Sequence, residues 1–282
     1  MGLNRFDELR QVLIEEDLIT SDGYLAHTIS CPECTYLKSD FTYRRGIWRG
    51  EEQNSLLRSR RGVTSNLVVG HSDRTFSKMN SFLAYAKGFR YVWGINVLPI
   101  EKLASSIPLG LTNSTSESAA HLIFGNHSHL EEAISITQPK RFKAIYYANF
   151  SLGTNFQERS KVKKILDQIE SPFSEPLISN RGRVEYLKSL RQSDLVICPE
   201  GNGVDTHRIW ETLYMGGTPA VLLNPIINPL VANLPVLVLQ DWSELLDSKR
   251  IERMWNELDV KNYNFNKLRL SYWINQMCIL RR

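Results

Sequence analysis

The second half of the chain alternates short apolar segments with segments of helical spacing. Such alternation with short connections is typical of a parallel, doubly wound sheet, because each helix returns the chain to the start of the next strand. The expected strands are FKAIYYANF (142–150), SDLVICPE (193–200), TPAVLL (218–223) and LPVLVL (234–239). The expected helices are 154–170, 182–192, 205–216, 242–258 and 266–282. This pattern predicts an α/β fold.

The first half repeats the pattern less regularly. SNLVVG (65–70), FRYVWGINV (89–97) and ASSIPLGL (104–111) read as strands, and residues 78–88 read as a helix that ends at a glycine. TQPKR (137–141) is the best boundary. We therefore expect two Rossmann-like domains facing across a cleft, residues 1–138 and 139–262. A C-terminal helix (263–282), with Tyr272 and Trp273, is expected to pack back on the first domain.

Composition excludes several classes of protein. The 282 residues carry a net charge of +4 and four cysteines, too few for a disulfide scaffold of this length. No apolar run reaches the length of a signal sequence or a membrane span, so a soluble, cytoplasmic protein is expected. The mild positive charge suits an anionic ligand and does not by itself indicate nucleic acid.

The segment between the strand at 193–200 and the next helix reads EGNGVDTHRIWE (200–211). In doubly wound sheets, ligands bind beyond the carboxyl ends of strands, at a helix N-terminus. Gly201 and Gly203 are expected to permit positive φ and close approach of a ligand. Asp205 or Thr206 is expected to cap the helix. The positive end of the helix then favours a phosphate or diphosphate.

Arg208 and Glu211 lie three residues apart, so they share one face of this helix. A guanidinium in the first turn can bind phosphate oxygens in bidentate fashion, and a carboxylate can accept both hydroxyls of a ribose. The pattern is neither the dinucleotide G-x-G-x-x-G fingerprint nor a P-loop. Together these residues indicate a nucleotide site.

The block GNGVDTHRIWETLYMGGTPAVL (201–222) resembles the signature of exostosin-like glycosyltransferases and their small microbial and viral relatives. The segment YYANFSLGTNFQERSKV (146–162) resembles the first strand–helix unit of the same donor domain. The resemblance implies a GT-B fold, a nucleotide-sugar donor, a glycan acceptor and no required metal or cofactor. The donor-site residues that it implies are Asn149, Ser151, Asn155, Arg159, Glu200, Gly201, Asn202, Gly203, Val204, Asp205, Thr206, His207, Arg208 and Glu211.

Some relatives with this block are xylosyltransferases, so the resemblance makes UDP-xylose the first candidate donor. UDP-glucuronate, UDP-galactose and a GDP-sugar stay open. The family favours inversion of the anomeric centre, which needs a base for the acceptor hydroxyl. VVGHSDR (68–74) supplies two candidates just past a strand, and we expect Asp73 to be the base with His71 second. Ser72 and Asp73 could instead cap the next helix.

Two further patterns carry alternatives. Cys31 and Cys34 form a lone CxxC pair without a second pair at zinc-finger spacing, so no metal is expected there. Six arginines between Arg44 and Arg61, with interleaved aromatic residues, leave a nucleic-acid-binding protein as a rival function, although nucleic acid is not the expected partner. A GT-B-type nucleotide-sugar epimerase is the rival enzyme, and the sequence leaves the oligomeric state open.

Overall fold

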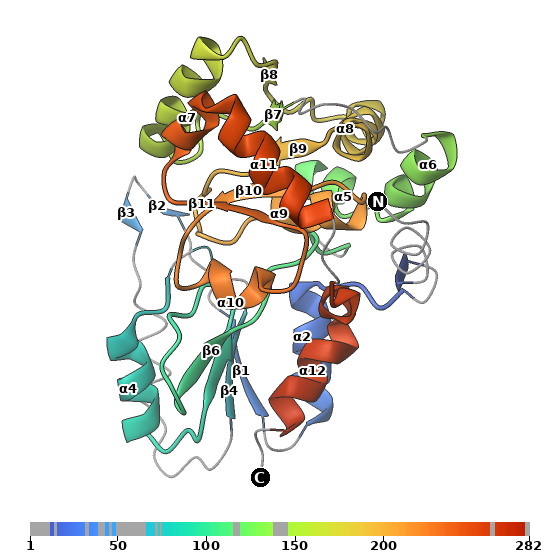
Figure 1. The fold of residues 1–282 in the computed structure, drawn as a ribbon. Helices are drawn as coiled ribbons and strands as arrows, with labels where there is room; N and C mark the ends of the chain where they lie inside the picture. Colours follow the sequence, from blue (N-terminus) through green and yellow to red (C-terminus); the bar gives the residue numbers. More distant parts are fainter. Residues whose placement is uncertain are drawn as a thin grey trace.

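The computed structural model describes residues 12–13, 16–31, 34–38, 43–44, 47–48, 66–70, 73, 75–114, 119–137, 146–259 and 263–279. Within these residues the chain forms two parallel sheets and a short antiparallel pair, β2 (Tyr43–Arg44) and β3 (Ile47–Trp48). The sheets lie one above the other in Figure 1, with the N-terminal sheet below. The predicted domain boundaries at residues 138 and 262 fall outside the described residues.

The first sheet has the strand order β1-β4-β5-β6, with all pairs parallel. Its strands are β1 (Cys34–Lys38), β4 (Asn66–Gly70), β5 (Val92–Gly94) and β6 (Ala104–Ser106). Successive side chains of a strand point to opposite faces. Leu67 and Val69 therefore pack with Ala84 of α4 (Lys78–Ala86), whereas Val68 lies in the core with Tyr24 of α2 (Ser21–Ser30).

The second sheet has the strand order β11-β10-β9-β7-β8 and is also parallel. Its strands are β7 (Tyr146–Asn149), β8 (Phe173–Ser174), β9 (Leu195–Ile197), β10 (Pro219–Leu222) and β11 (Leu237–Leu239). Leu195 and Ile197 pack toward α7 (Phe156–Gln168) and α11 (Ser248–Asp259). Val196 packs on the other face, toward α8 (Asn180–Gln192) and α9 (His207–Tyr214). Helices thus cover both faces.

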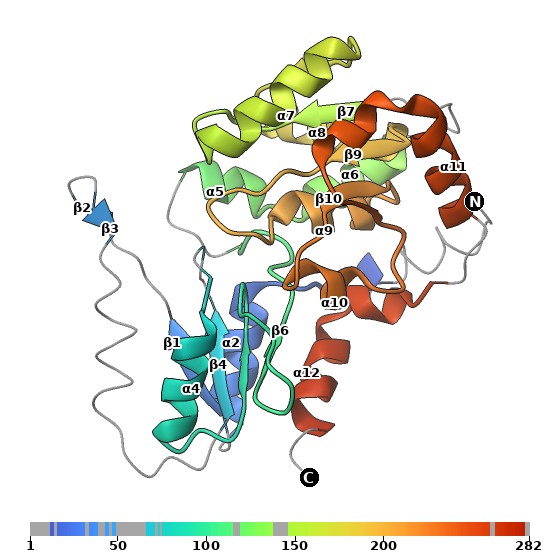
Figure 2. The same cartoon turned by 60° about the vertical axis from the view of Figure 1, so that its left-hand side comes forward.

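The C-terminal helix α12 (Leu270–Ile279) lies beside α2 in both Figure 1 and Figure 2. A Cβ added at Gly23 would lie 2.4 Å from Cδ2 of Leu270, so the two helices are in close contact at this glycine. Trp273 and Met277 of α12 are buried in the core that also contains Tyr24 and Val68. The last helix therefore packs on the first sheet's side of the molecule.

Side-chain caps explain where several helices begin. Ser77 Oγ accepts the Asn80 N–H at the start of α4, and Ser179 Oγ accepts the Gly182 N–H at the start of α8. The remaining elements are α5 (Ala119–Phe124), α6 (Ser128–Ile136), α10 (Ile227–Val231), and the 3₁₀ helices η1 (Trp242–Leu246) and η2 (Phe265–Leu268). The N-cap of α9, Thr206, makes no side-chain cap bond.

The predicted α/β class with parallel sheets is confirmed, and most expected strands and helices are present. A continuous helix over 242–258 is wrong: Asp247 adopts a non-helical conformation (φ −95°, ψ 84°) and its carboxylate accepts the Arg250 N–H, so it separates η1 from α11. The expected helix over 266–282 is likewise divided, because Arg269 is extended between η2 and α12. Neither α2 nor β1 was expected from the sequence.

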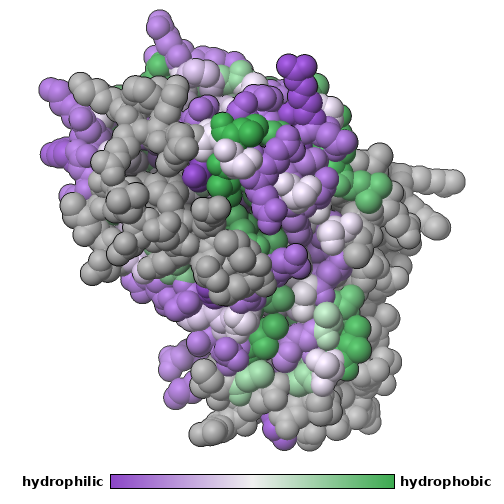
Figure 3. All heavy atoms as spheres, turned by 90° about the vertical axis from the view of Figure 1, so that its right-hand side faces the viewer, coloured by the Kyte–Doolittle hydropathy of each residue, from purple (hydrophilic) through white to green (hydrophobic). Residues whose placement is uncertain are grey.

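The surface is mixed in character. On the side shown in Figure 3, hydrophobic residues form separate patches among hydrophilic ones. Among the described residues, no helix combines the length and the apolar character that crossing a bilayer requires.

Candidate functional site

The strand order of the second sheet fixes where a ligand site can form. From β7 the chain passes to β8 on one side and then to β9 on the other, so β7 and β9 flank the point at which the winding reverses. Loops that leave two such strands separate from each other, and the crevice between them is where doubly wound sheets bind ligands. Ser151 follows β7 here, and Gly201 to Arg208 follow β9.

A cavity of about 310 Å³ lies at this point, at the small end of the range for small-molecule sites. Its walls come from both sheets. Asp73, which follows β4, and Leu109 and Thr112, which follow β6, face the β7 and β9 loops of the second sheet. The carboxyl ends of the two sheets therefore meet at one cavity.

The β9–α9 loop docks directly on the first sheet. The Asp205 N–H donates to Asn96 Oδ1 (2.9 Å), and Asp205 Oδ2 accepts the Leu109 N–H (2.7 Å). Asp205 Oδ1 accepts the Trp210 Nε1–H within α9 (2.8 Å). Burial raises the pKa of Asp205 to about 7, and these donors offset part of the cost of its charge. Asp205 thus joins α9 to the first sheet instead of capping the helix.

The two loop glycines differ from the sequence expectation. Gly201 and Gly203 do not have positive φ, so that expectation is wrong. A Cβ at Gly203 would lie 2.5 Å from Asn96 Nδ2 and 2.7 Å from the Asp73 carbonyl oxygen. A Cβ at Gly201 would lie 3.1 Å from Arg159 Nη2. The glycines allow the loop to approach other parts of the protein closely.

Two guanidinium groups of the cavity wall, those of Arg159 and Arg208, lie near one buried aromatic ring. The Cζ atoms of Arg159 and Arg208 lie 5.6 Å and 5.9 Å from the ring centre of Phe150. Arg159 is held by the Glu200 and Ser151 carbonyls, and burial together with the charge of Arg208 lowers its pKa to about 10. Among the described residues, neither arginine pairs with a carboxylate. An anion here would relieve their mutual repulsion.

Three buried polar atoms of residues in the cavity wall have no hydrogen-bond partner among the described residues: Arg183 Nε, Thr206 Oγ1 and Arg208 Nε. Buried polar groups are nearly always paired, so such exceptions call for an explanation. Thr206 and Arg208 belong to the start of α9, whose positive end favours an anion. The chemistry of this part of the wall therefore favours an anionic ligand.

Glu211 lies deeper in the same wall. Its Oε1 pairs with Arg183 Nη2 at 2.7 Å, and its Oε2 accepts the Tyr186 hydroxyl at 2.8 Å. Burial raises the pKa of Glu211, but the charge and hydrogen bond of Arg183, together with the smaller effects of His207 and Tyr186, outweigh burial and lower the pKa overall. Glu211 and Arg208 both line the cavity. The contacts of Glu211 with Arg183 and Tyr186 also hold α9 against α8.

His207 and Asp73 line the cavity from opposite sheets. His207 Nδ1 contacts the Gly110 carbonyl oxygen at 2.8 Å. Because a carbonyl can only accept, Nδ1 carries the proton and Nε2 of the neutral ring is an acceptor. Burial lowers the pKa of His207, which favours the neutral ring. Asp73 is exposed, and its Oδ2 accepts a 3.4 Å hydrogen bond from Asn202 Nδ2.

Most predicted site residues come together in the cavity wall: Asp73, Asn149, Ser151, Arg159, Gly201, Asn202, Gly203, Asp205, Thr206, His207, Arg208 and Glu211. Three others lie outside it. Asn155 is the left-handed N-cap of α7, the Glu200 carboxylate accepts from Asn224, and Val204 packs against the core. His71 lies outside the described residues.

The sequence did not single out Arg183 and Tyr186 of α8. They are three residues apart on one helical face, yet only the packing of α8 beside α9 turns that face toward Glu211. Thr154 and Phe124 also line the cavity without having been expected. No local pattern marks these residues, since their role depends on contacts distant in the chain.

Comparison with known proteins bears on the same segment. Residues 137–229 match a family model described as the RXYLT1 C-terminal domain, which represents an exostosin-like xylosyltransferase family. No curated protein matches the chain. The matched residues contain β7 to β10 and the whole β9–α9 loop, while the first sheet lies outside them. The predicted resemblance is therefore confirmed: the segment that builds the arginine site is similar to the C-terminal domain of an exostosin-like xylosyltransferase family.

Proposed function

We propose that the protein transfers a sugar from a UDP-sugar to a hydroxyl of a glycan acceptor, and that UDP-xylose is the first donor to test. The observation that carries the proposal is the pair of guanidiniums, Arg159 and Arg208, which share the Phe150 ring at the mouth of α9 without a carboxylate partner among the described residues. The match to an exostosin-like xylosyltransferase family supports both the reaction class and the choice of sugar.

In this proposal the arrangement is of the GT-B type. The second sheet binds the donor and the first sheet presents the acceptor, because the cavity opens between their carboxyl ends. The diphosphate lies between Arg159 and Arg208. Thr206 Oγ1 and Arg208 Nε, which have no hydrogen-bond partner among the described residues, donate to its oxygens. These cationic groups stabilise the departing diphosphate without a metal ion.

Transfer then proceeds in one displacement with inversion. The acceptor oxygen bonds to the anomeric carbon while the bond from that carbon to the diphosphate breaks, and the bonding pair leaves with UDP. The acceptor proton passes to a base in the cavity wall. Asp73 is the base predicted from the sequence, and its exposure leaves room for an acceptor.

His207 is a second candidate base, favoured by its Nδ1 contact with the Gly110 carbonyl, which leaves Nε2 as an acceptor. Asp73→Asn and His207→Gln separate the candidates. Loss of the base lowers the rate by roughly 10²–10⁴ without abolishing UDP binding. If neither substitution slows transfer, neither Asp73 nor His207 is the base. If the product retains the anomeric configuration by proton NMR, the one-displacement mechanism is wrong.

The donor is tested by a thermal-shift panel of UDP-xylose, UDP-glucuronate, UDP-galactose and a GDP-sugar, with EDTA present. A ligand at 100 times its dissociation constant adds about 2.7 kcal/mol of stability. Stabilisation by UDP-sugars, reduced in Arg208→Ala, supports the proposal. Conversion of the UDP-sugar without any acceptor would support an epimerase. The side chains of the arginine run Arg44–Arg61 lie outside the described residues. Oligonucleotide binding that is not competed by UDP would favour the rival function, a nucleic-acid-binding protein.

A further inference from the structure

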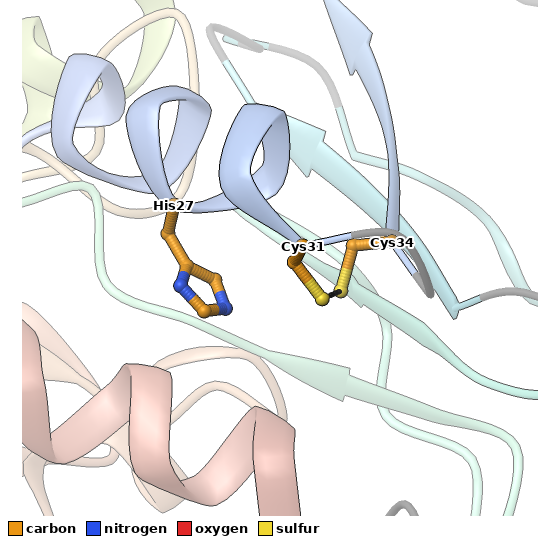
Figure 4. Close-up of side chains that lie close together, drawn as sticks. All are labelled: His27, Cys31 and Cys34. Carbon is orange, nitrogen blue, oxygen red and sulfur yellow. Dashed lines mark hydrogen bonds between the residues drawn. The ribbon is translucent and has the colours of Figure 1, made fainter.

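A cluster of metal-binding side chains lies away from the cavity, at the junction of α2 and β1. His27 is in the last turn of α2, Cys31 follows that helix directly, and Cys34 is the first residue of β1. His27 and Cys31 are four residues apart, so the helix places them on one face. Figure 4 shows the imidazole and the two sulfur atoms on the same side of the helix end.

The distances suit a thiophilic metal ion. The donor atoms of His27, Cys31 and Cys34 all lie within 4.8 Å of one another, and the two sulfur atoms are 3.1 Å apart without a disulfide bond. A tetrahedral zinc ion, with bonds of about 2.3 Å to sulfur and about 2.0–2.1 Å to nitrogen, places its donors about 3.5–3.8 Å apart. Shifts of an ångström or less would bring the three groups to this spacing.

From this geometry we infer that His27, Cys31 and Cys34 bind a zinc ion, with the fourth position taken by water or another donor. Two thiolates balance the charge of the ion, and Cys31 is buried, which protects the site from solvent. The sequence alone did not predict a metal here, because the CxxC pair with the nearby His27 falls short of the four ligands that zinc needs. The third ligand, His27, comes from α2, a helix that the sequence pattern did not indicate.

The position of the cluster assigns the ion a structural role. Cys34 pairs with Asn66 at the amino end of β4, whereas Asp73 and the cavity lie beyond the carboxyl end of that strand. Five strand residues separate these ends by about 13 Å. The ion would join the end of α2 to the start of β1, and α2 in turn contacts α12 at Leu270.

Cobalt titration of the reduced full-length protein tests the inference. One equivalent of Co²⁺ is expected to give a thiolate-to-cobalt charge-transfer band and the ligand-field bands of a tetrahedral site, and Zn²⁺ is expected to remove both. Cys31→Ser and Cys34→Ser should lose the charge-transfer band wholly or in large part. His27→Ala should weaken cobalt binding while the two thiolates still give that band.

Cys278→Ser is the matched control, because this half-buried thiol lies in α12 outside the cluster, and its spectrum should equal that of the wild type. Circular dichroism confirms that each variant folds. A second readout is the melting temperature: a thiol-competent chelator should lower it in zinc-loaded wild type and in Cys278→Ser, but not in Cys34→Ser. Absence of cobalt bands in reduced wild type, or unchanged bands in both Cys31→Ser and Cys34→Ser, would overturn the inference, as would a Cys31–Cys34 pair that only forms a disulfide.

Discussion

Replacing Glu211 with alanine should destabilise the fold before it affects nucleotide binding. The side chains of Arg183 and Glu211 are 3% and 6% exposed, and their atoms meet at 2.7 Å. Arg183 is also stacked near the rings of Phe124 and Tyr186, so it cannot easily turn to solvent when its partner is removed. Breaking a buried ion pair by removing one member costs about 3–5 kcal/mol, because the other charge stays buried.

Urea unfolding followed by circular dichroism measures this loss. Glu185→Ala is the matched control. Glu185 is a glutamate within α8 that also forms an ion pair, but its side chain is 59% exposed and that of its partner Lys188 is 26% exposed. An exposed pair contributes about 0–1 kcal/mol. The double variant Arg183→Met, Glu211→Leu should be more stable than either single change, since no unpaired charge remains.

The pH dependence has a defined sign. The pKa of Glu211 is lowered in the folded protein, so the pair contributes stability above the ordinary carboxyl range near 4.5 and loses it as the pH falls below that value. The stability difference between wild type and Glu211→Gln should therefore shrink below pH 4.5. A Glu211→Ala variant within 1 kcal/mol of wild type at pH 7 would refute this reasoning.

Three further predictions concern the cavity. Arg208→Ala should weaken UDP binding by about 10- to 150-fold, because it removes a charge-assisted hydrogen bond of about 1.5–3 kcal/mol. Calorimetry measures the affinity, and Arg250→Ala, at an exposed arginine, is the control. Equal affinities of Arg208→Ala and wild type would place the diphosphate elsewhere. Gly203→Ala should lower the free energy of unfolding by about 1–3 kcal/mol, because the added Cβ overpacks against Asn96 and Asp73. Gly153→Ala is the control, since its Cβ would lie 3.5 Å from the nearest atom. Thermal unfolding measures both variants, and equal melting temperatures would count against the close contact at Gly203. If His207 is the base, the transfer rate should fall as the pH drops below 6.5, because burial lowers the pKa of His207 and the ring must be neutral to accept a proton; a rate–pH profile that keeps its acid limb in His207→Gln would assign the limb to another group.

Much of the second sheet could be predicted from the sequence because its signals are local. Apolar segments alternate with amphipathic ones, and the glycine loop, acid and arginine of residues 200–211 stand next to each other in the chain. Such patterns report the carboxyl end of a strand followed by a helix. The position of Arg208 in the first turn of α9 follows from that alone.

The parts that were missed depend on contacts between distant segments. A side chain at position 203 would meet Asn96 and the Asp73 backbone, which follow strands of the first sheet. These residues are distant from Gly203 in the chain, so the contact leaves no local pattern in the sequence. Arg183 is important because α8 packs beside α9. Helix α2 has a weak apolar pattern and is held by Thr20 at its start and α12 on its side, so the sequence did not show that His27 and the two cysteines lie close together.

The central claim is that Arg159 and Arg208 bind the diphosphate of a nucleotide sugar. Calorimetric titration of UDP and of uridine, both with EDTA, tests it most directly, since the two ligands differ only in the diphosphate. Two charge-assisted contacts of about 1.5–3 kcal/mol each predict that UDP binds more tightly than uridine by roughly 10² to 10⁴. Equal affinities for UDP and uridine, or UDP binding that appears only when magnesium or manganese is added, would contradict the account.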